Sequence, residues 1–140
     1  MSFLKCAAKK RFKMTDKIVF DSSAILALLK MEQGHEMVAE HLENAIVSSV
    51  NFCEVITVLS RKGFGQEKVI KFLKETFLHI EDFDTEQAII GASFNDVTKN
   101  GLSLGDRACL ALAKSKNLPA LTADKVWKEL ELSVEVQLIR

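Results

Sequence analysis

The chain has 140 residues, 48% of them hydrophobic, and its formal net charge at pH 7 is zero. This length suits a single domain with one sizeable core, and the neutral balance gives no sign of a partner attracted by overall charge. Three widely spaced cysteines and the lack of any apolar stretch long enough for a bilayer argue against a disulfide framework, a zinc site and a membrane protein.

The first residues are predicted to lie outside the fold. Residues 1–13 precede the first strand-like run, and their apolar side chains come before the basic ones, which is the wrong order for a signal peptide. The odd number of cysteines favours free thiols, which fits a reducing cytoplasm. We therefore expect an N-terminal extension, a single domain over residues 14–140 and a cytoplasmic location.

Short strand-like runs alternate with helical runs in the first half of the chain. Residues 17–20, KIVF, are β-branched and aromatic and predict a buried strand, whereas residues 23–31 are apolar nearly all round and predict a buried helix. The segments that follow predict, in chain order, a helix over 34–45, a strand over 45–50, a helix over 51–62 and an amphipathic helix over 66–77. Gly63 and Gly65 mark the end of the helix over 51–62.

The second half continues the alternation. Its predicted elements, in chain order, are a short strand over 78–83, a helix over 85–100, a helix over 103–116, a strand over 119–123, a short helix over 124–130 and a closing strand over 134–139. Asn117 and Pro119 are typical of the end of the 103–116 helix. Strands that alternate with helices predict an α/β domain with a mainly parallel sheet.

Several acidic residues occupy positions that helix capping alone would explain. Asp21 directly follows the first predicted strand, and Asp124 follows a later one. Aspartate is a favoured N-cap because its oxygens accept backbone N–H groups that otherwise lack a partner. Ser103 and Asp106 have the spacing of a capping box. Taken singly, each of these acids is explained as a helix cap.

Taken together, the acids also predict a shared site. Asn51 and Glu54 form a looser capping box just after the strand over 45–50, with Asn51 as the cap. Helices that follow parallel strands begin at the carboxyl edge of the sheet, where ligands bind in open α/β folds. Asp21, Glu54 and Asp124 should therefore share one edge. Topology does not force Asp106 to the same place.

Carboxylates on one edge repel each other unless a cation joins them. Hard divalent cations prefer oxygen ligands, and magnesium often binds one or two carboxylates together with water and substrate phosphates. Helix N-termini favour the ionised form of an acid, so we expect these positions to keep the acids charged. A metal at such a site suits phosphoryl chemistry, because it lowers the pKa of bound water and neutralises charge on the phosphate. No histidine is then required as a base.

The motifs that carry these acids resemble those of a known family. The segments IVFDSSAILALL, SSVNFCEV, LSLGDRACLALAKSKNLPALTAD and KVW occur in the order found in PIN-domain nucleases, most closely the VapC-type toxins of bacterial toxin–antitoxin pairs. The resemblance covers about residues 17–139. Its most specific part is the G-D and T-x-D pair, whose aspartates are eighteen residues apart.

The resemblance implies a fold, a chemistry and partners. The fold would be a PIN-like three-layer α/β/α domain with a mainly parallel central sheet. Asp21, Glu54, Asp106 and Asp124 would form the catalytic metal site, while Ser22 and Thr122 match small polar positions that support the acids by hydrogen bonds. The resemblance implies an Mg²⁺- or Mn²⁺-dependent endoribonuclease with an RNA substrate, a cognate antitoxin that silences it, and a homodimer.

Three basic residues are candidate RNA contacts. Arg107 directly follows Asp106, while Lys68 and Lys71 belong to a basic run at near-helical spacing. A solvated helix face explains the lysines as well, and a solvated or ion-paired role explains Arg107. Both interpretations stay open for each residue.

Other functions remain to be separated from the ribonuclease toxin. A phosphatase or phosphotransferase of the haloacid-dehalogenase kind also has an aspartate after its first strand, but it needs D-x-D, and Ser23 occupies the position of the second acid. A non-catalytic binding module of the same fold would have no chemical need for the complete set of acids. A free-standing RNA-processing nuclease would lack an antitoxin gene beside its own.

Overall fold

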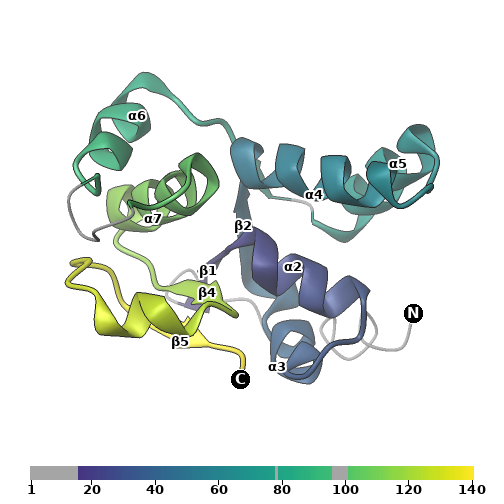
Figure 1. Cartoon of the computed structure of the whole chain (residues 1–140), viewed down its shortest axis with the longest axis horizontal. Helices are drawn as coiled ribbons and strands as arrows, with labels where there is room; N and C mark the ends of the chain where they lie inside the picture. The colour runs from purple at the N-terminus through teal and green to yellow at the C-terminus, as the bar shows by residue number, and fades with distance from the viewer. Residues whose placement is uncertain (1–15, 78, 96–100) are drawn as a thin grey trace.

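The computed structural model describes residues 16–77, 79–95 and 101–140, so the predicted extension over residues 1–13 lies outside the described residues. Within these ranges five strands form one sheet in the order β3-β2-β1-β4-β5, and every neighbouring pair is parallel (Figure 1). The strands are β1 (Ile18–Phe20), β2 (Ala45–Ser48), β3 (Ile80–Glu81), β4 (Ala120–Thr122) and β5 (Val136–Leu138). The predicted parallel α/β architecture is confirmed.

Helices cover both faces of the sheet (Figure 1). One face packs on α2 (Ser22–Leu29), α3 (His35–Glu40), α4 (Ser49–Arg61) and α5 (Gln66–Thr76), and the other on α7 (Leu104–Lys116) with α6 (Thr85–Ala92) beside it. A hydrophobic core lies on each face of the sheet. Ile18 and Phe20 of β1 pack into the core under α2–α5, and Val19 packs into the core under α7. This alternation follows from the two-residue period of a strand.

The central strand β1 lies between β2 and β4, so the direction in which the chain crosses the sheet reverses beside it. Asp21 continues the β1–β4 pairing by donating its backbone N–H to Leu121 O at 2.9 Å. Helices α2 and α4 begin directly where β1 and β2 end. The carboxyl ends of β1, β2 and β4 therefore meet at the switch point where open α/β sheets bind ligands.

Two predicted helices are shorter than the sequence pattern indicates. The helix over 85–100 ends at Ala92 within the described residues, where the Phe94 N–H turns back to Gly91 O and the Phe94 ring is buried against α7. The segment over 34–45 divides into α3 and the 3₁₀ segment η2 (Leu42–Asn44). In both places tertiary packing ends a helix that local periodicity alone would continue.

Two further boundaries also differ from the predictions. The strand over 45–50 stops at Ser48, because the Ser48 hydroxyl accepts the Val50 N–H and begins α4 two residues earlier than predicted. The segment over 124–130 forms the 3₁₀ segment η3 (Lys125–Glu129) in place of an α-helix. Among the described helices, none has the length and hydrophobicity required to span a membrane.

Candidate functional site

The four predicted acids lie near the carboxyl edge of the sheet. Asp21 follows β1, Glu54 lies in the second turn of α4, Asp106 in the first turn of α7, and Asp124 between β4 and η3. Burial raises the pKa of both Asp21 and Asp106, and charge repulsion adds to it: from Asp106 at Asp21, and from Asp124 and Glu54 at Asp106. Packing between α4 and α7 brings Asp106 to the others, although the order of strands did not require it.

Asp21 is the buried member of the group, with 4% of its surface exposed. Its Oδ2 accepts hydrogen bonds from Ser23 Oγ at 2.7 Å and from Thr122 Oγ1 at 2.9 Å. Asp21 occupies the N-cap position of α2, yet its side chain caps no backbone N–H there. Neighbouring hydroxyl groups, rather than the helix, hold this carboxylate.

Burial decides the ionisation of Asp21. Loss of hydration raises the pKa of this carboxyl from 3.8 to about 6, against the hydrogen bond from Ser23, and the negative charge of Asp106 adds to the rise. Burial therefore opposes the ionisation that a helix start favours, although a pKa of about 6 still leaves this carboxyl mostly ionised at pH 7. The field of a helix end is worth less than the hydration that a buried carboxylate loses.

Two hydroxyl groups connect Asp21 to the end of β4. Ser23 Oγ accepts the Ala123 N–H at 2.9 Å, and Thr122 Oγ1 accepts the Asp124 N–H at 3.1 Å. Both hydroxyl hydrogens are donated to Asp21. Asp21 and the backbone of Asp124 thus share one hydrogen-bond network across residues far apart in the chain.

Glu54 is held by a second network. Its Oε1 accepts from Ser22 Oγ at 2.6 Å and from Asn51 Nδ2 at 3.1 Å. A Cβ atom at residue 105 would overlap the Glu54 carboxylate, so Gly105 provides the space in which the carboxylate lies. This contact explains why a glycine precedes Asp106 in the G-D motif.

The prediction that Asn51 caps a helix is wrong. Ser48 is the N-cap of α4, and Asn51 lies inside the helix with none of its surface exposed. Its amide donates to Ser22 Oγ at 2.9 Å, to Glu54 and to Gly105 O at 3.1 Å. The three-residue spacing to Glu54 fits a side-chain contact on one helix face as well as it fits a cap, so the sequence alone did not separate the two roles.

Asp106 and Asp124 both lie at the acidic edge and cap the helical segments that begin there. The Ser103 hydroxyl accepts the Asp106 N–H at 3.1 Å and the Asp106 carboxylate accepts the Ser103 N–H at 3.2 Å, which confirms the capping box. Asp124 is exposed, and its Oδ1 accepts the Val126 N–H at 3.0 Å. Partial burial raises the pKa of Asp106 more than its hydrogen bonds with Ser103 lower it.

None of the candidate RNA contacts forms an ion pair with one of the four acids in the part of the chain that the structure describes. Within the described residues Arg107 makes no ion pair, and its buried Nε has no hydrogen-bond partner. Lys68 and Lys71 are exposed on α5. Lys68 borders a groove that includes Leu59 of α4. Leu59 follows Glu54 by five residues, which is about 7.5 Å along the helix. RNA contact by these three residues stays a prediction.

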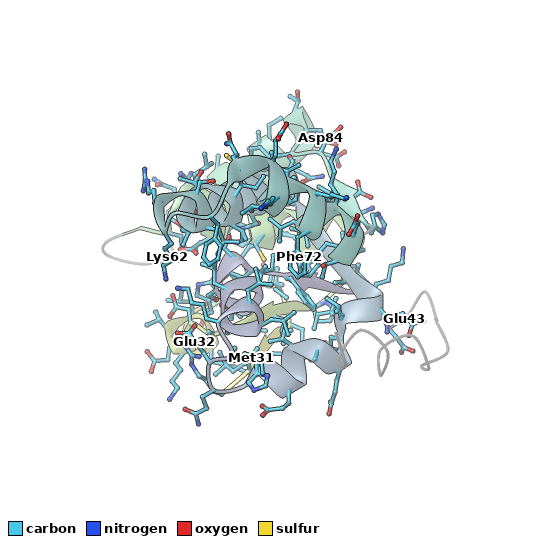
Figure 2. All side chains as sticks on the ribbon, turned by 90° about the vertical axis from the view of Figure 1, so that its right-hand side faces the viewer. Met31, Glu32, Glu43, Lys62, Phe72 and Asp84 are labelled. Carbon is cyan, nitrogen blue, oxygen red and sulfur yellow. The ribbon has the colours of Figure 1, made fainter. Side chains whose placement is uncertain are left out.

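The groove beside Lys68 is a separate feature of this side of the molecule. It has a volume of about 470 Å³ and is lined mainly by apolar side chains of α2, α4 and α5. Figure 2 views this side, with Phe72 of α5 between the α4–α5 hairpin and α2. The charged border residue of this groove is Lys68, which stands among its otherwise apolar lining.

The donor atoms of the acidic edge fit a hard divalent cation. The carboxylates of Asp21, Glu54, Asp106 and Asp124 supply oxygen ligands, which Mg²⁺ and Mn²⁺ prefer. Among the described residues no three His, Cys, Asp or Glu side chains converge tightly enough to enclose an ion. Magnesium does not need such a cage, because water and substrate phosphate commonly complete its six ligands.

Comparison with known proteins places the chain in a sequence family. The PIN domain family matches residues 18–132. A VapC ribonuclease of Mycobacterium bovis and the ribonuclease VapC42 of Mycobacterium tuberculosis are each 28% identical over 115 residues, which cover 74% of this chain and 88% of either relative.

Solved structures share the fold. A toxin–antitoxin complex from Klebsiella pneumoniae contains a chain that is 19% identical, with a TM-score of 0.70 over 89% of this chain and 98% of that chain. A chain of the DNA-bound VapBC from Salmonella typhimurium is 15% identical, with a TM-score of 0.69 over 89% of this chain and 98% of its own length. At these identities the likeness establishes the fold alone.

Proposed function

The chain belongs to the PIN domain family, and we propose that it is a divalent-metal-dependent endoribonuclease, the toxin of a toxin–antitoxin pair. The observation that carries the proposal is the gathering of four acids at the switch point, with Asp21 buried among them. Relatives named as ribonucleases support RNA as the substrate.

The four acids divide into two pairs in the proposed chemistry. Asp21, aligned by Ser23 and Thr122, and Glu54, aligned by Ser22, would bind the cation. A bound Mg²⁺ or Mn²⁺ would activate water and neutralise charge on the scissile phosphate. Asp106 and Asp124 would extend the negative field that attracts the ion, at positions fixed by helix capping.

Burial of Asp21 favours this assignment. An ionised carboxylate that has lost its hydration is costly, and a nearby cation offsets that cost. The same acid in a non-catalytic module would only destabilise the fold. A buried carboxylate among other acids is therefore better explained by a cation site than by a structural role.

The direct test is cleavage of RNA by the purified protein. We expect cleavage with Mg²⁺ or Mn²⁺, none in EDTA, and recovery when the metal is restored. Asp21→Asn should lose at least 100-fold in rate, because it removes a charged ligand without changing the side-chain volume.

Contaminating ribonuclease is controlled by purifying the variant in parallel with the wild-type protein. Cleavage that persists in EDTA, or full activity in Asp21→Asn, would refute the metal mechanism. Absence of cleavage together with absence of metal binding would instead identify a binding module. Accumulation of a phosphoprotein at Asp21 would favour a phosphotransferase.

The antitoxin is the proposed protein partner. Chains of similar fold occur in toxin–antitoxin complexes, and the groove between α2, α4 and α5 offers this chain an apolar surface with Lys68 at its border. Such a surface suits a helix with an apolar face flanked by acidic residues. A homodimer stays a prediction.

Co-expression with the product of the neighbouring reading frame tests this partner. We expect a stable complex that silences cleavage, and we expect Phe72→Asp to lose the complex while its RNA cleavage continues. Gln66→Asp is the matched control, because it adds the same single negative charge at an exposed position of α5 outside the groove lining. A complex unaffected by Phe72→Asp would refute the groove as the contact surface.

A further inference from the structure

We propose that Asn51 is a positioning residue that holds the Glu54 carboxylate and the first turn of α7 at the acidic edge. The inference rests on the proposed function, since it concerns the presentation of Glu54 to the metal. Asn51 has no exposed surface, and its amide contacts Glu54 from one turn earlier on α4. None of its hydrogen bonds serves a helix cap.

The surroundings determine which way the Asn51 amide faces. The Glu54 carboxylate and the Gly105 carbonyl can only accept hydrogen bonds, so the NH₂ group must face both. Ser22 Oγ and Glu54 Oε1 are 2.6 Å apart, so one amide hydrogen serves both of them and the other serves Gly105 O. If the amide were flipped, its oxygen would face the Glu54 carboxylate and the Gly105 carbonyl and be repelled by both.

The remaining atom of the amide argues against a merely structural role. Asn51 Oδ1 is buried and has no hydrogen-bond partner among the described residues. A buried acceptor without a partner destabilises the folded state. Asparagine is thus a poor choice for packing alone, and its value lies in the NH₂ group. Residues that lower the stability of the fold in this way are typical of functional sites.

Asn51 also joins three elements that supply the site. Its partners Ser22, on α2, and Gly105, on α7, are separated from it by 29 and 54 residues in the chain. Gly105 adjoins Asp106, so the bond to its carbonyl fixes the first turn of α7 against α4. Groups that orient metal-binding carboxylates typically change metal affinity or activity 10–100-fold when removed.

The first experiment uses metal-free protein and depends on no activity. Urea unfolding is measured in EDTA for the wild type, Asn51→Ala, Glu54→Ala and the double variant. If Asn51 holds Glu54, the two single shifts in midpoint are not additive, because the first substitution already removes the contact that the second would lose. Additive shifts would overturn the inference.

The second experiment titrates MnCl₂ into the same proteins by calorimetry. We expect the dissociation constant of Asn51→Ala to rise at least tenfold. Gln87→Ala is the matched control, because Gln87 is another buried amide with a partnerless oxygen, on α6. It should change Mn²⁺ affinity less than twofold even if it lowers the unfolding midpoint as much.

The outcomes separate this inference from the proposed function. Unchanged Mn²⁺ affinity in Asn51→Ala overturns the positioning role. An equal loss in Gln87→Ala overturns it too, since the loss would then follow stability alone. A wild-type protein that binds no Mn²⁺ overturns the proposed function, and the unfolding cycle still decides whether Asn51 holds Glu54.

Discussion

The acidic edge contains two kinds of carboxylate. Asp21 and Glu54 accept hydrogen bonds from four side chains, and two of these donors lie 32 and 101 residues away in the chain. Asp106 and Asp124 accept backbone N–H groups two or three residues away at helix starts. The first pair depends on the tertiary fold, whereas the second pair stabilises its own helix termini.

The two kinds of carboxylate differ in how much their negative charge destabilises the folded protein. Burial makes ionised Asp21 unfavourable in the folded protein, while Asp124 is exposed and completes a cap at little cost. The same Asp→Asn change should therefore stabilise the metal-free protein at Asp21 and leave its stability almost unchanged at Asp124, although both changes are expected to impair cleavage.

The largest effect is expected at Asp21. Its pKa rises from 3.8 to about 6 on folding, so stability present below pH 3.8 is lost as the pH rises through about 6. The loss in metal-free protein should reach about 3 kcal/mol by pH 7. Asp21→Asn should remove this dependence and be more stable than wild type at pH 7.5, as measured by urea unfolding in EDTA.

An unchanged pH dependence in Asp21→Asn would show that another group causes it. Mg²⁺ should narrow the difference between wild type and the variant, because it stabilises only the protein with the ionised carboxylate. A variant that Mg²⁺ stabilises as strongly as wild type would place the cation elsewhere.

The next effect is expected at Gly105. An alanine Cβ there would overlap the Glu54 carboxylate, which must then leave Ser22 and Asn51. Cleavage should fall about 10–100-fold. The loss of folding stability caused by this overlap should be partly offset, because alanine favours the helix more than glycine does. Gly65→Ala is the control, since its Cβ would meet nothing and its φ is ordinary.

A Gly105→Ala protein with wild-type cleavage would mean that Glu54 does not need its present position. Comparable loss in Gly65→Ala would point to a general effect of helix stiffening rather than to the displaced carboxylate. The rate at saturating Mg²⁺ separates lost affinity from lost chemistry.

A moderate effect is expected at Ser103. Ser103→Ala removes the hydroxyl that accepts the Asp106 N–H and should cost about 1 kcal/mol in thermal or urea unfolding. Cleavage should stay within about threefold of wild type, because Asp106 still accepts the backbone N–H of residue 103. Loss of cleavage greater than that of Gly105→Ala would contradict the division into two kinds of carboxylate.

The smallest effect on stability is expected at Asp124. Asparagine is as good an N-cap as aspartate, so Asp124→Asn should change the free energy of unfolding by less than about 0.5 kcal/mol. A stabilisation as large as that of Asp21→Asn would show that exposure does not distinguish the two acids. Cleavage measured on the same sample reports the contribution of the charge.

The sequence was informative where local rules act. Strand runs, the Ser103–Asp106 box and the left-handed Asn117 that ends α7 all follow from short-range patterns. The placement of Asp21 and Asp124 at one edge followed from topology alone.

The rest required long-range packing. Nothing local distinguishes Asn51 as a buried donor from Asn51 as a cap, because the spacing to Glu54 is the same in both cases. The role of Ser23 depends on the β1–β4 pairing, and the role of Gly105 depends on how α7 meets α4. The raised pKa of Asp21 likewise reflects burial, which no residue spacing reports.

The bond from Thr122 to Asp21 joins residues 101 positions apart in a chain of 140. During synthesis Asp21 and Glu54 are made long before β4, the strand that supplies Thr122. Contacts of such separation form late in folding, since the loop between them must close first. The topology therefore delays assembly of the acidic edge until β4 has been synthesised, because Thr122 belongs to that strand.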